Sequence, residues 1–212
     1  MNKPNNTADD RQRASTPPNN KEHLFLPLSG GSPEGDRGGG WGAGRTGGLK
    51  FTDYDIVFQE IPDEVTLAIN LSNCPHCCPG CHSPHLQTDV GERLDETALS
   101  ALLRKYSSSI TCVCFMGGDA MPEEVCRLSD FVRHATEGNI KTAWYSGFDK
   151  LRHPAWANHF SYVKLGAYIE ALGGLSNRTT NQRLYRVENN HQMKDITAEI
   201  SDKKQIIQNN FL

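Results

Sequence analysis

The sequence predicts an α/β protein in which helices cover a parallel sheet. From residue 51 to residue 165, short apolar runs of strand length alternate with stretches whose apolar residues recur at helical spacing. Several of the strand-like runs are apolar on both faces, which is typical of parallel strands buried from two sides. The composition, 37% hydrophobic and 22% charged over 212 residues, is that of a globular domain of ordinary size.

Five strands and three helical stretches make up this alternation. The strands are expected at residues 56–58, 65–69, 110–115, 141–145 and 162–165. Asp95 suits the N-cap of the first helix, Pro122 suits the first turn of the second, and a short helical stretch is expected over 149–157. The apolar face of the first helix consists of Leu99, Leu102, Leu103 and Tyr106. In such a sheet, functional residues gather at the carboxyl ends of the strands.

Residues 1–48 differ in composition from the rest of the chain. Asn, Pro, Gly, Ser, Asp and Arg dominate this segment, and only a short apolar island from Leu24 to Leu26 interrupts it. A segment of this kind cannot bury enough apolar surface to offset the entropy lost on folding. We therefore expect a disordered extension over residues 1–48 and one folded domain over residues 49–212.

Charge, hydropathy and cysteine number exclude several classes of protein. The formal net charge of −3 leaves no excess of Lys and Arg for a nucleic acid or an anionic membrane surface. The longest apolar run, Ile110 to Met116, is far shorter than the ~20 residues of a membrane-spanning helix, so a cytoplasmic protein is expected. The seven cysteines are odd in number and four of them lie between residues 74 and 81, which indicates metal binding in a reducing compartment.

The segment from Asn73 to His82 carries Cys74, Cys78 and Cys81 in the spacing Cys-x3-Cys-x2-Cys. Three thiolates on one short loop can hold three irons of a cubane cluster. The fourth iron then has no protein thiolate and keeps an open coordination position, as catalytic metal sites do. We predict that these three cysteines are the metal ligands.

The same segment also divides into two adjoining Cys-x2-Cys pairs, Cys74 with Cys77 and Cys78 with Cys81, which is a zinc-like pattern. In zinc ribbons about 15 to 20 residues separate the two pairs so that both reach one ion. The cubane interpretation is therefore favoured, and Cys77 is then a bystander. The neighbouring histidines are interpreted as polar loop residues: His76, His82 and His85.

The cysteine segment resembles the signature of the radical S-adenosylmethionine (SAM) superfamily, and a His directly after the third Cys resembles the activating enzymes of glycyl radical enzymes. The resemblance implies a partial, incomplete parallel β/α barrel with a [4Fe-4S] cluster and SAM as cofactors. In that family the open iron chelates the amino and carboxylate groups of SAM. Carried over, the backbone around Gly80, Cys81 and His82 would pack against the adenine.

A second segment, from Met116 to Ala120, resembles the Gly-Gly-Glu-Pro segment with which this family binds the methionine amino group of SAM. Glycines permit close approach of the backbone, and a carboxylate accepts from an ammonium group. The resemblance implies cofactor contacts at Gly117, Gly118 and Asp119. The chain departs from the family pattern in having Asp for Glu and Ala for Pro.

Two further segments resemble one subfamily, the anaerobic ribonucleoside-triphosphate reductase activating proteins. They are the Tyr-Ser-Gly segment at residues 145–147 and the Asn-Gln-Arg segment at residues 181–183. The resemblance implies an oxidoreductase that cleaves SAM reductively and generates a glycyl radical on the reductase. Its expected partners are the large reductase subunit and an electron donor such as reduced flavodoxin or ferredoxin. No catalytic residue beyond the cluster ligands is expected, because the cofactors supply the chemistry.

Two alternatives remain open from the sequence. One is a radical SAM enzyme that acts on a small molecule, and the other is a non-catalytic iron-sulfur or zinc protein. Reductive cleavage of SAM to 5′-deoxyadenosine separates the enzymes from the non-catalytic protein.

Overall fold

The computed structural model describes residues 47–188 and 192–200. The extension expected over residues 1–48 lies outside the described residues except for its last two, so its disorder stays a prediction. The same holds for the domain boundary after residue 48.

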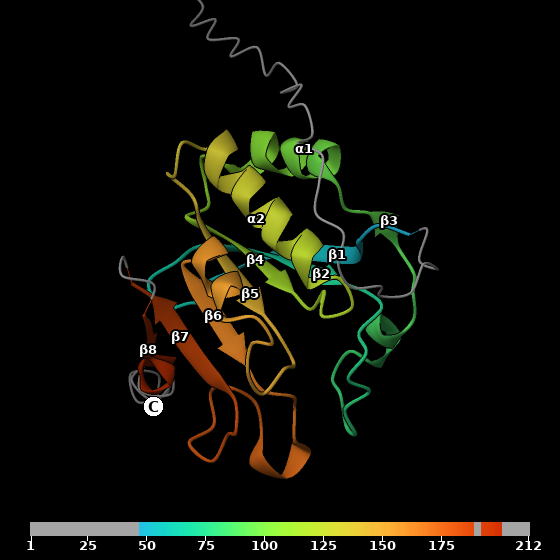
Figure 1. The fold of residues 1–212 in the computed structure, drawn as a ribbon, viewed down its shortest axis with the longest axis vertical. Coiled ribbons are helices and arrows are strands. Elements are labelled where there is room, and N and C mark those ends of the chain that lie inside the picture. Colours follow the sequence, from blue (N-terminus) through green and yellow to red (C-terminus); the bar gives the residue numbers. More distant parts are fainter. Residues whose placement is uncertain (1–46, 189–191, 201–212) are drawn as a thin grey trace, which may run out of the picture. The chain divides into compact units, whose positions relative to one another are not determined.

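The described residues form a mixed α/β structure around one eight-stranded sheet, with the strand order β3-β1-β2-β4-β5-β6-β7-β8 (Figure 1). The strands are β1 (Lys50–Val57), β2 (Thr66–Leu71), β3 (Glu92–Arg93), β4 (Cys112–Met116), β5 (Lys141–Tyr145), β6 (Tyr162–Leu165), β7 (Arg183–Val187) and β8 (Met193–Asp195). The α-helices are α1 (Glu96–Tyr106) and α2 (Pro122–Ala135). Three 3₁₀ helices complete the set: η1 (Pro84–Gln87), η2 (Pro154–His159) and η3 (Glu170–Leu172).

The expectation of a parallel sheet is correct only for the centre. Strands β2, β4, β5 and β6 run parallel, as expected for apolar strands joined by helical crossovers. On both sides the pairing is antiparallel: β1 with β2 and β3, and β7 with β6 and β8. Among the described strands, four of the seven pairings are therefore antiparallel, which corrects the all-parallel expectation. The turn at residues 58–65 joins β1 to β2, and antiparallel neighbours of this kind need no crossover helix.

Helices α1 and α2 cover the same face of the sheet (Figure 1). Asp95 is the N-cap of α1 and accepts hydrogen bonds from the amides of Thr97 and Ala98, as its position in the sequence predicted. Pro122 opens α2, also as predicted. The apolar stripes of both helices pack on strand residues such as Phe115 and Trp144, which are fully buried.

The opposite face of the sheet carries a second, smaller core. It contains Cys112, Cys114, Tyr145 and Leu184, together with Ile61 from the turn between β1 and β2. Helices α1 and α2 lie on the other face, so the packing here comes from turns and from the segment of Ile196 and Ile200, in which residues 197–200 are helical (Figure 1). The three cysteines outside the cysteine segment, Cys112, Cys114 and Cys126, are buried and pack as small core residues.

The two outermost strands of the sheet are short. Strand β3 consists only of Glu92 and Arg93, both exposed, and β8 spans Met193–Asp195.

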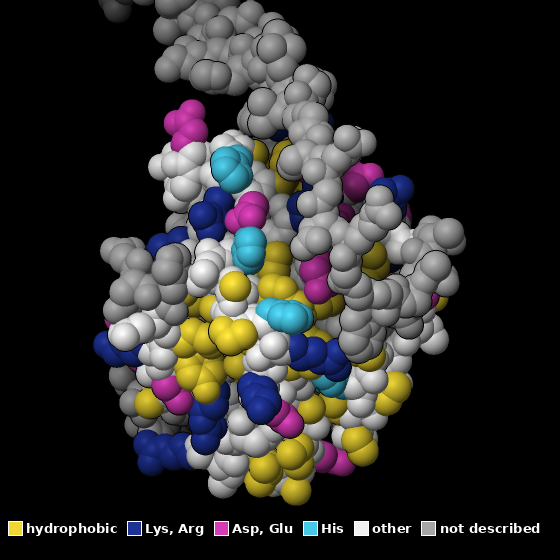
Figure 2. Space-filling view, in the orientation of Figure 1, with side chains coloured by type: hydrophobic (Ala, Val, Ile, Leu, Met, Phe, Trp, Pro, Cys, Tyr) yellow, Lys and Arg dark blue, Asp and Glu magenta, His cyan; other side chains and the backbone are white. Residues whose placement is uncertain are grey.

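Basic, acidic and apolar side chains are interspersed on the face shown in Figure 2. Within the described part of the chain, no helix has the length and apolar character that a membrane crossing requires.

Candidate functional site

The cysteine, Gly-Gly-Asp and Tyr-Ser-Gly segments stand at the ends of β2, β4 and β5, which are three of four adjacent parallel strands. In the register of these strands, Asn70 of β2 pairs with Met116 of β4, Met116 with Tyr145 of β5, and Tyr145 with Lys164 of β6. The loops after these residues therefore all begin at the same end of the sheet, where the parallel strands have their carboxyl ends. This confirms that the cysteine segment and the Gly-Gly-Asp segment lie at the carboxyl ends of neighbouring strands.

The cysteine loop, residues 74–81, begins three residues after β2. Its first amide, that of Cys74, donates to the carbonyl of Leu86, and the amide of Cys81 donates to the carbonyl of Cys78. Cys74, Cys78 and Cys81 are half-buried, whereas Cys77 is exposed and has a positive φ of 47°. The Sγ of Cys81 also accepts from the amide of Ser83 at 3.4 Å. The three predicted ligands thus share an environment that Cys77 does not.

The thiols of this loop lie within electrostatic range of one another. Burial raises the pKa of Cys74 above its ordinary value, and negative charge on Asp119, Cys78 and Cys81 acts in the same direction. All are free thiols, the soft ligands that iron-sulfur clusters require, so the chemistry of the donor set fits a cubane. In the described ranges no three His, Cys, Asp or Glu side chains are assembled as a metal site, so the choice of ligands rests on the spacing.

Gly117 and Gly118 form the turn after β4, with φ values of 101° and 86°. These values lie in the left-handed region that favours glycine. A Cβ on Gly118 would also lie 2.5 Å from Val125 Cγ2 and 2.8 Å from Leu71 Cδ1. Both glycines are therefore explained by backbone conformation and packing, and their predicted contact with SAM stays a prediction.

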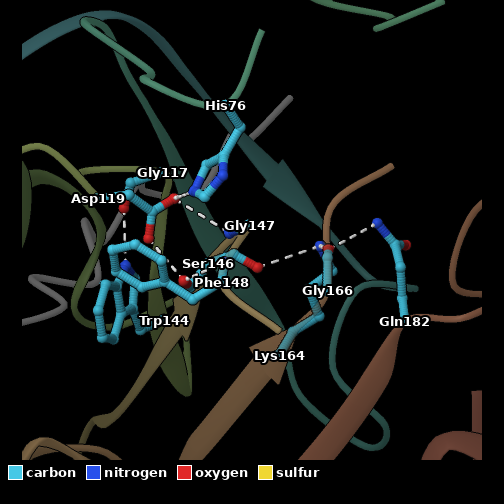
Figure 3. A network of polar contacts seen from close by, with 10 residues as sticks. All are labelled: His76, Gly117, Asp119, Trp144, Ser146, Gly147, Phe148, Lys164, Gly166 and Gln182. Atoms are coloured by element: carbon cyan, nitrogen blue, oxygen red, sulfur yellow. Dashed lines mark hydrogen bonds and ion pairs between the residues drawn. The ribbon is translucent and has the colours of Figure 1, made fainter. Parts of the chain in front are cut away.

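Asp119 is buried at this edge, and its side chain is 1% exposed. Its Oδ1 accepts from Ser146 Oγ at 2.5 Å, and its Oδ2 accepts from the amide of Gly147 at 3.0 Å. Nε2 of His76 lies 3.1 Å from the same Oδ2 (Figure 3). The carboxylate thus ties the loops after β2, β4 and β5 together. Trp144 of β5 also holds the turn that contains Gly117, since its Nε1 donates to the carbonyl of Gly117 at 2.7 Å.

A cavity of about 470 Å³ opens beside the last cysteine of the loop. Its volume is in the range of small-molecule and cofactor sites. It lies on the face of the sheet opposite α1 and α2, and its lining includes Cys81, His82, Met116, Tyr145, Lys164 and Tyr168. The predicted adenine contacts at Cys81 and His82 therefore adjoin a space of suitable size.

Lys164 is the buried cation of this cavity. The residue is 9% exposed, and its Nζ donates to the carbonyls of Gly166 at 2.8 Å and Ser146 at 3.4 Å (Figure 3). Burial lowers the pKa of Lys164 to about 8, against the opposing effect of nearby negative charge on Asp119 and Cys78. A buried amine thus lines the same cavity as Cys81, the last cysteine of the predicted cluster loop.

Two residues of the segment after β6 complete the site, and sequence reasoning missed both. The ring of Tyr168 lies 4.6 Å from that of His82, and the carboxylate of Glu170 packs so closely on Gly80 that a Cβ there would lie 2.7 Å from its Oε2. The available signal was positional, because this segment follows a parallel strand of the same sheet. Gly80 is therefore in close contact with Glu170 although it stays exposed.

Comparison with known families gives one match. Residues 65–163 match the family model of a 4Fe-4S single cluster domain, a range that contains the cysteine loop and the Gly-Gly-Asp turn. Comparison with curated proteins and with solved structures gave no match. The fold and site therefore indicate a mixed α/β protein with a 4Fe-4S cluster-binding domain. This domain is consistent with an iron-sulfur protein of the radical SAM type.

Proposed function

We propose that this protein is a radical SAM activating enzyme that generates a glycyl radical on an anaerobic ribonucleoside-triphosphate reductase. The observation that carries the proposal is the position of the three-thiol loop. It stands at the carboxyl edge of the parallel strands, and its last cysteine lines a cavity large enough for SAM. The central parallel strands are compatible with the partial barrel of that superfamily.

Cys74, Cys78 and Cys81 would hold the cluster, which when bound supplies the electron for reductive cleavage of SAM. Lys164 offers a buried positive charge in the cavity, suited to the carboxylate of SAM. His82 and Tyr168 offer aromatic rings at the same cavity, suited to the adenine. These residues bind and orient the ligand and exclude water from it.

The contact predicted between Asp119 and the ammonium group of SAM has less support. The carboxylate is already surrounded by three hydrogen-bond donors, and its side chain has almost no exposed surface. An ammonium group would have to displace one of these donors.

A glycine of a partner protein is a suitable target for this site, because removal of its Cα hydrogen gives a radical delocalised over two peptide groups. The reductase would have to present that glycine on a mobile loop, and the complex would then be transient. Reduced flavodoxin or ferredoxin is the proposed electron donor.

The test is anaerobic reconstitution of the full chain with iron and sulfide, followed by incubation with SAM, a reductant and the large reductase subunit. We expect 5′-deoxyadenosine in the products and a glycyl radical doublet by electron paramagnetic resonance. A reductase whose radical glycine is replaced by alanine is the matched control and should show no doublet. Formation of 5′-deoxyadenosine with no protein radical would favour the small-molecule alternative, and a cluster that cleaves no SAM would favour the non-catalytic one.

A further inference from the structure

His76 lies inside the cysteine loop, between Cys74 and Cys78, and none of the proposed cofactor contacts uses it. We propose that His76 is a positioning residue that anchors the cysteine loop to the carboxyl ends of β4 and β5, and that Asp119 serves this anchor rather than the ammonium group of SAM. The inference rests on the proposed function only in taking residues 74–81 as the cluster loop.

The hydrogen bond between His76 and Asp119 has a defined direction. A carboxylate only accepts, so the Nε2 of His76, 3.1 Å from Oδ2, carries the proton and donates. Oδ2 also accepts from the amide of Gly147, and Oδ1 accepts from Ser146 (Figure 3). Hydrogen bonds to a charged acceptor are stronger than neutral ones, and this one lies on a side chain that is 1% exposed. It therefore links two loops whose residues are 43 positions apart in the chain.

The shape of the site points to the same anchor. The imidazole ring of His76 stands edge-on to Phe148, with ring centroids 5.3 Å apart and an interplanar angle of 78°. A Cβ at Gly147 would lie 2.4 Å from Cδ2 of His76, a distance that real Cβ atoms do not adopt. Gly147 does not have a positive φ, so its backbone conformation does not require glycine. The space taken by the imidazole ring therefore explains why residue 147 has no side chain.

The anchor determines where the first half of the cysteine loop stands relative to the sheet. Residues 73–83 contain no helix or strand. Backbone hydrogen bonds join the first of them, Asn73 and Cys74, to Thr88 and Leu86, so beyond residue 74 the position of the segment depends more on side-chain contacts. The second half meets Tyr168 and Glu170, whereas the first half meets Asp119 and Gly147 through His76. Loss of the His76 contact should loosen the segment that carries Cys74 and Cys78.

Two variants separate the hydrogen bond from the fit of the ring. His76→Phe keeps a ring of similar shape and removes the donor, whereas His76→Gln removes the ring and places an amide donor close to the position of Nε2. His85→Phe is the matched control, because His85 is an exposed histidine just outside the loop. Gly147→Ala is a second, independent variant that crowds the ring and leaves its donor unchanged.

The first measurement is hydrogen-deuterium exchange at residues 74–82 of the cluster-free full chain, and the second is iron content with the electron paramagnetic resonance spectrum of the reduced, reconstituted protein. We expect His76→Phe and Gly147→Ala to accelerate exchange about tenfold, as for the loss of a hydrogen bond to a charged group, and to lower iron content or alter the spectrum. We expect His76→Gln to restore wild-type exchange and spectrum at least in part. His85→Phe should behave as wild type.

Asp119→Asn decides between the anchor and the ammonium contact. If the anchor is correct, this variant accelerates exchange at least as much as His76→Phe does, and the double variant shows less than the sum of the two effects, since both substitutions weaken the same contact. Asp119→Asn also weakens the contacts with Ser146 and Gly147, so its own effect can be the larger one. If Asp119→Asn leaves exchange and iron content unchanged and weakens only SAM binding, the inference is wrong. It is equally wrong if His76→Phe matches His85→Phe. Because neither readout needs SAM cleavage, a protein that binds the cluster and does not cleave SAM would refute the proposed function alone.

Discussion

Replacement of Lys164 by methionine is expected to stabilise the protein at neutral pH. At alkaline pH this stabilisation should disappear. Burial lowers the pKa of Lys164 from 10.5 to about 8. Between these two values the unfolded chain binds the proton and the folded chain does not, so the stability of the wild type increases with pH in that window. Below this window, the buried ammonium group lowers the free energy of unfolding by about 3 kcal/mol relative to a lysine whose pKa does not change on folding, at 1.36 kcal/mol per pH unit.

Methionine has no charge to bury and therefore lacks this dependence on pH. The carbonyls of Gly166 and Ser146 lose a donor in the variant, which costs about 1 to 2 kcal/mol at every pH. The difference in unfolding free energy between variant and wild type should then fall by about 2.5 kcal/mol from pH 7 to pH 10. We expect a net gain of about 1.5 kcal/mol at pH 7 and a small net loss at pH 10.

The assay is urea unfolding of the cluster-free protein at four pH values from 7 to 10, under reducing conditions and at constant ionic strength. Groups that titrate equally in both proteins cancel in the difference. Lys150→Met is the matched control, because Lys150 is exposed, and it should give a difference that does not change with pH. Parallel stability curves for wild type and Lys164→Met would refute the reasoning, since the buried amine would then cost nothing.

Three further predictions concern other parts of the molecule. After anaerobic reconstitution, Cys77→Ser should retain its iron and sulfide and Cys74→Ser should lose them; equal loss would contradict the ligand assignment. Trp144→Phe leaves the carbonyl of Gly117 without its donor and opens a small cavity, so it should cost about 2 to 3 kcal/mol and lower the melting temperature by about 5 to 10 °C. Asp95→Ala removes the cap of α1 and should cost about 1 kcal/mol, whereas an unchanged melting temperature would show that the cap contributes nothing.

The central elements of the fold could be predicted because their side chains face two buried surfaces. All five residues of β4 are apolar, so this strand could be recognised as a continuous apolar run in the sequence. Strands β5 and β6 have the predicted bounds. Strand β7, Arg183–Val187, has neither a continuous apolar run nor a regular alternation, and its antiparallel direction depends on which neighbour it meets. Strand β3, Glu92–Arg93, has no apolar residue from which to infer it.

The candidate site was predictable where it follows strand ends and unpredictable where it depends on contacts between loops. The order of the parallel strands was enough to bring the cysteine loop beside the Gly-Gly-Asp turn. A single histidine in a loop has no periodicity, so nothing in the sequence paired His76 with Asp119. Glu170 was missed for the same reason, since its contact with Gly80 comes from the path of the segment after β6.

The way in which the sheet ends determines how a foreign strand could be added to it. An exposed strand edge offers a ladder of unpaired amides and carbonyls, onto which a foreign strand can be added. Strand β3 pairs only with Lys50 and Phe51 of β1, so within the described residues the outer edge of β1 from Asp53 to Val57 has no strand beside it. This stretch carries two exposed carboxylates, Asp53 and Asp55, and charged side chains at an edge oppose stacking between copies. Fibril formation through this edge of the sheet is therefore disfavoured.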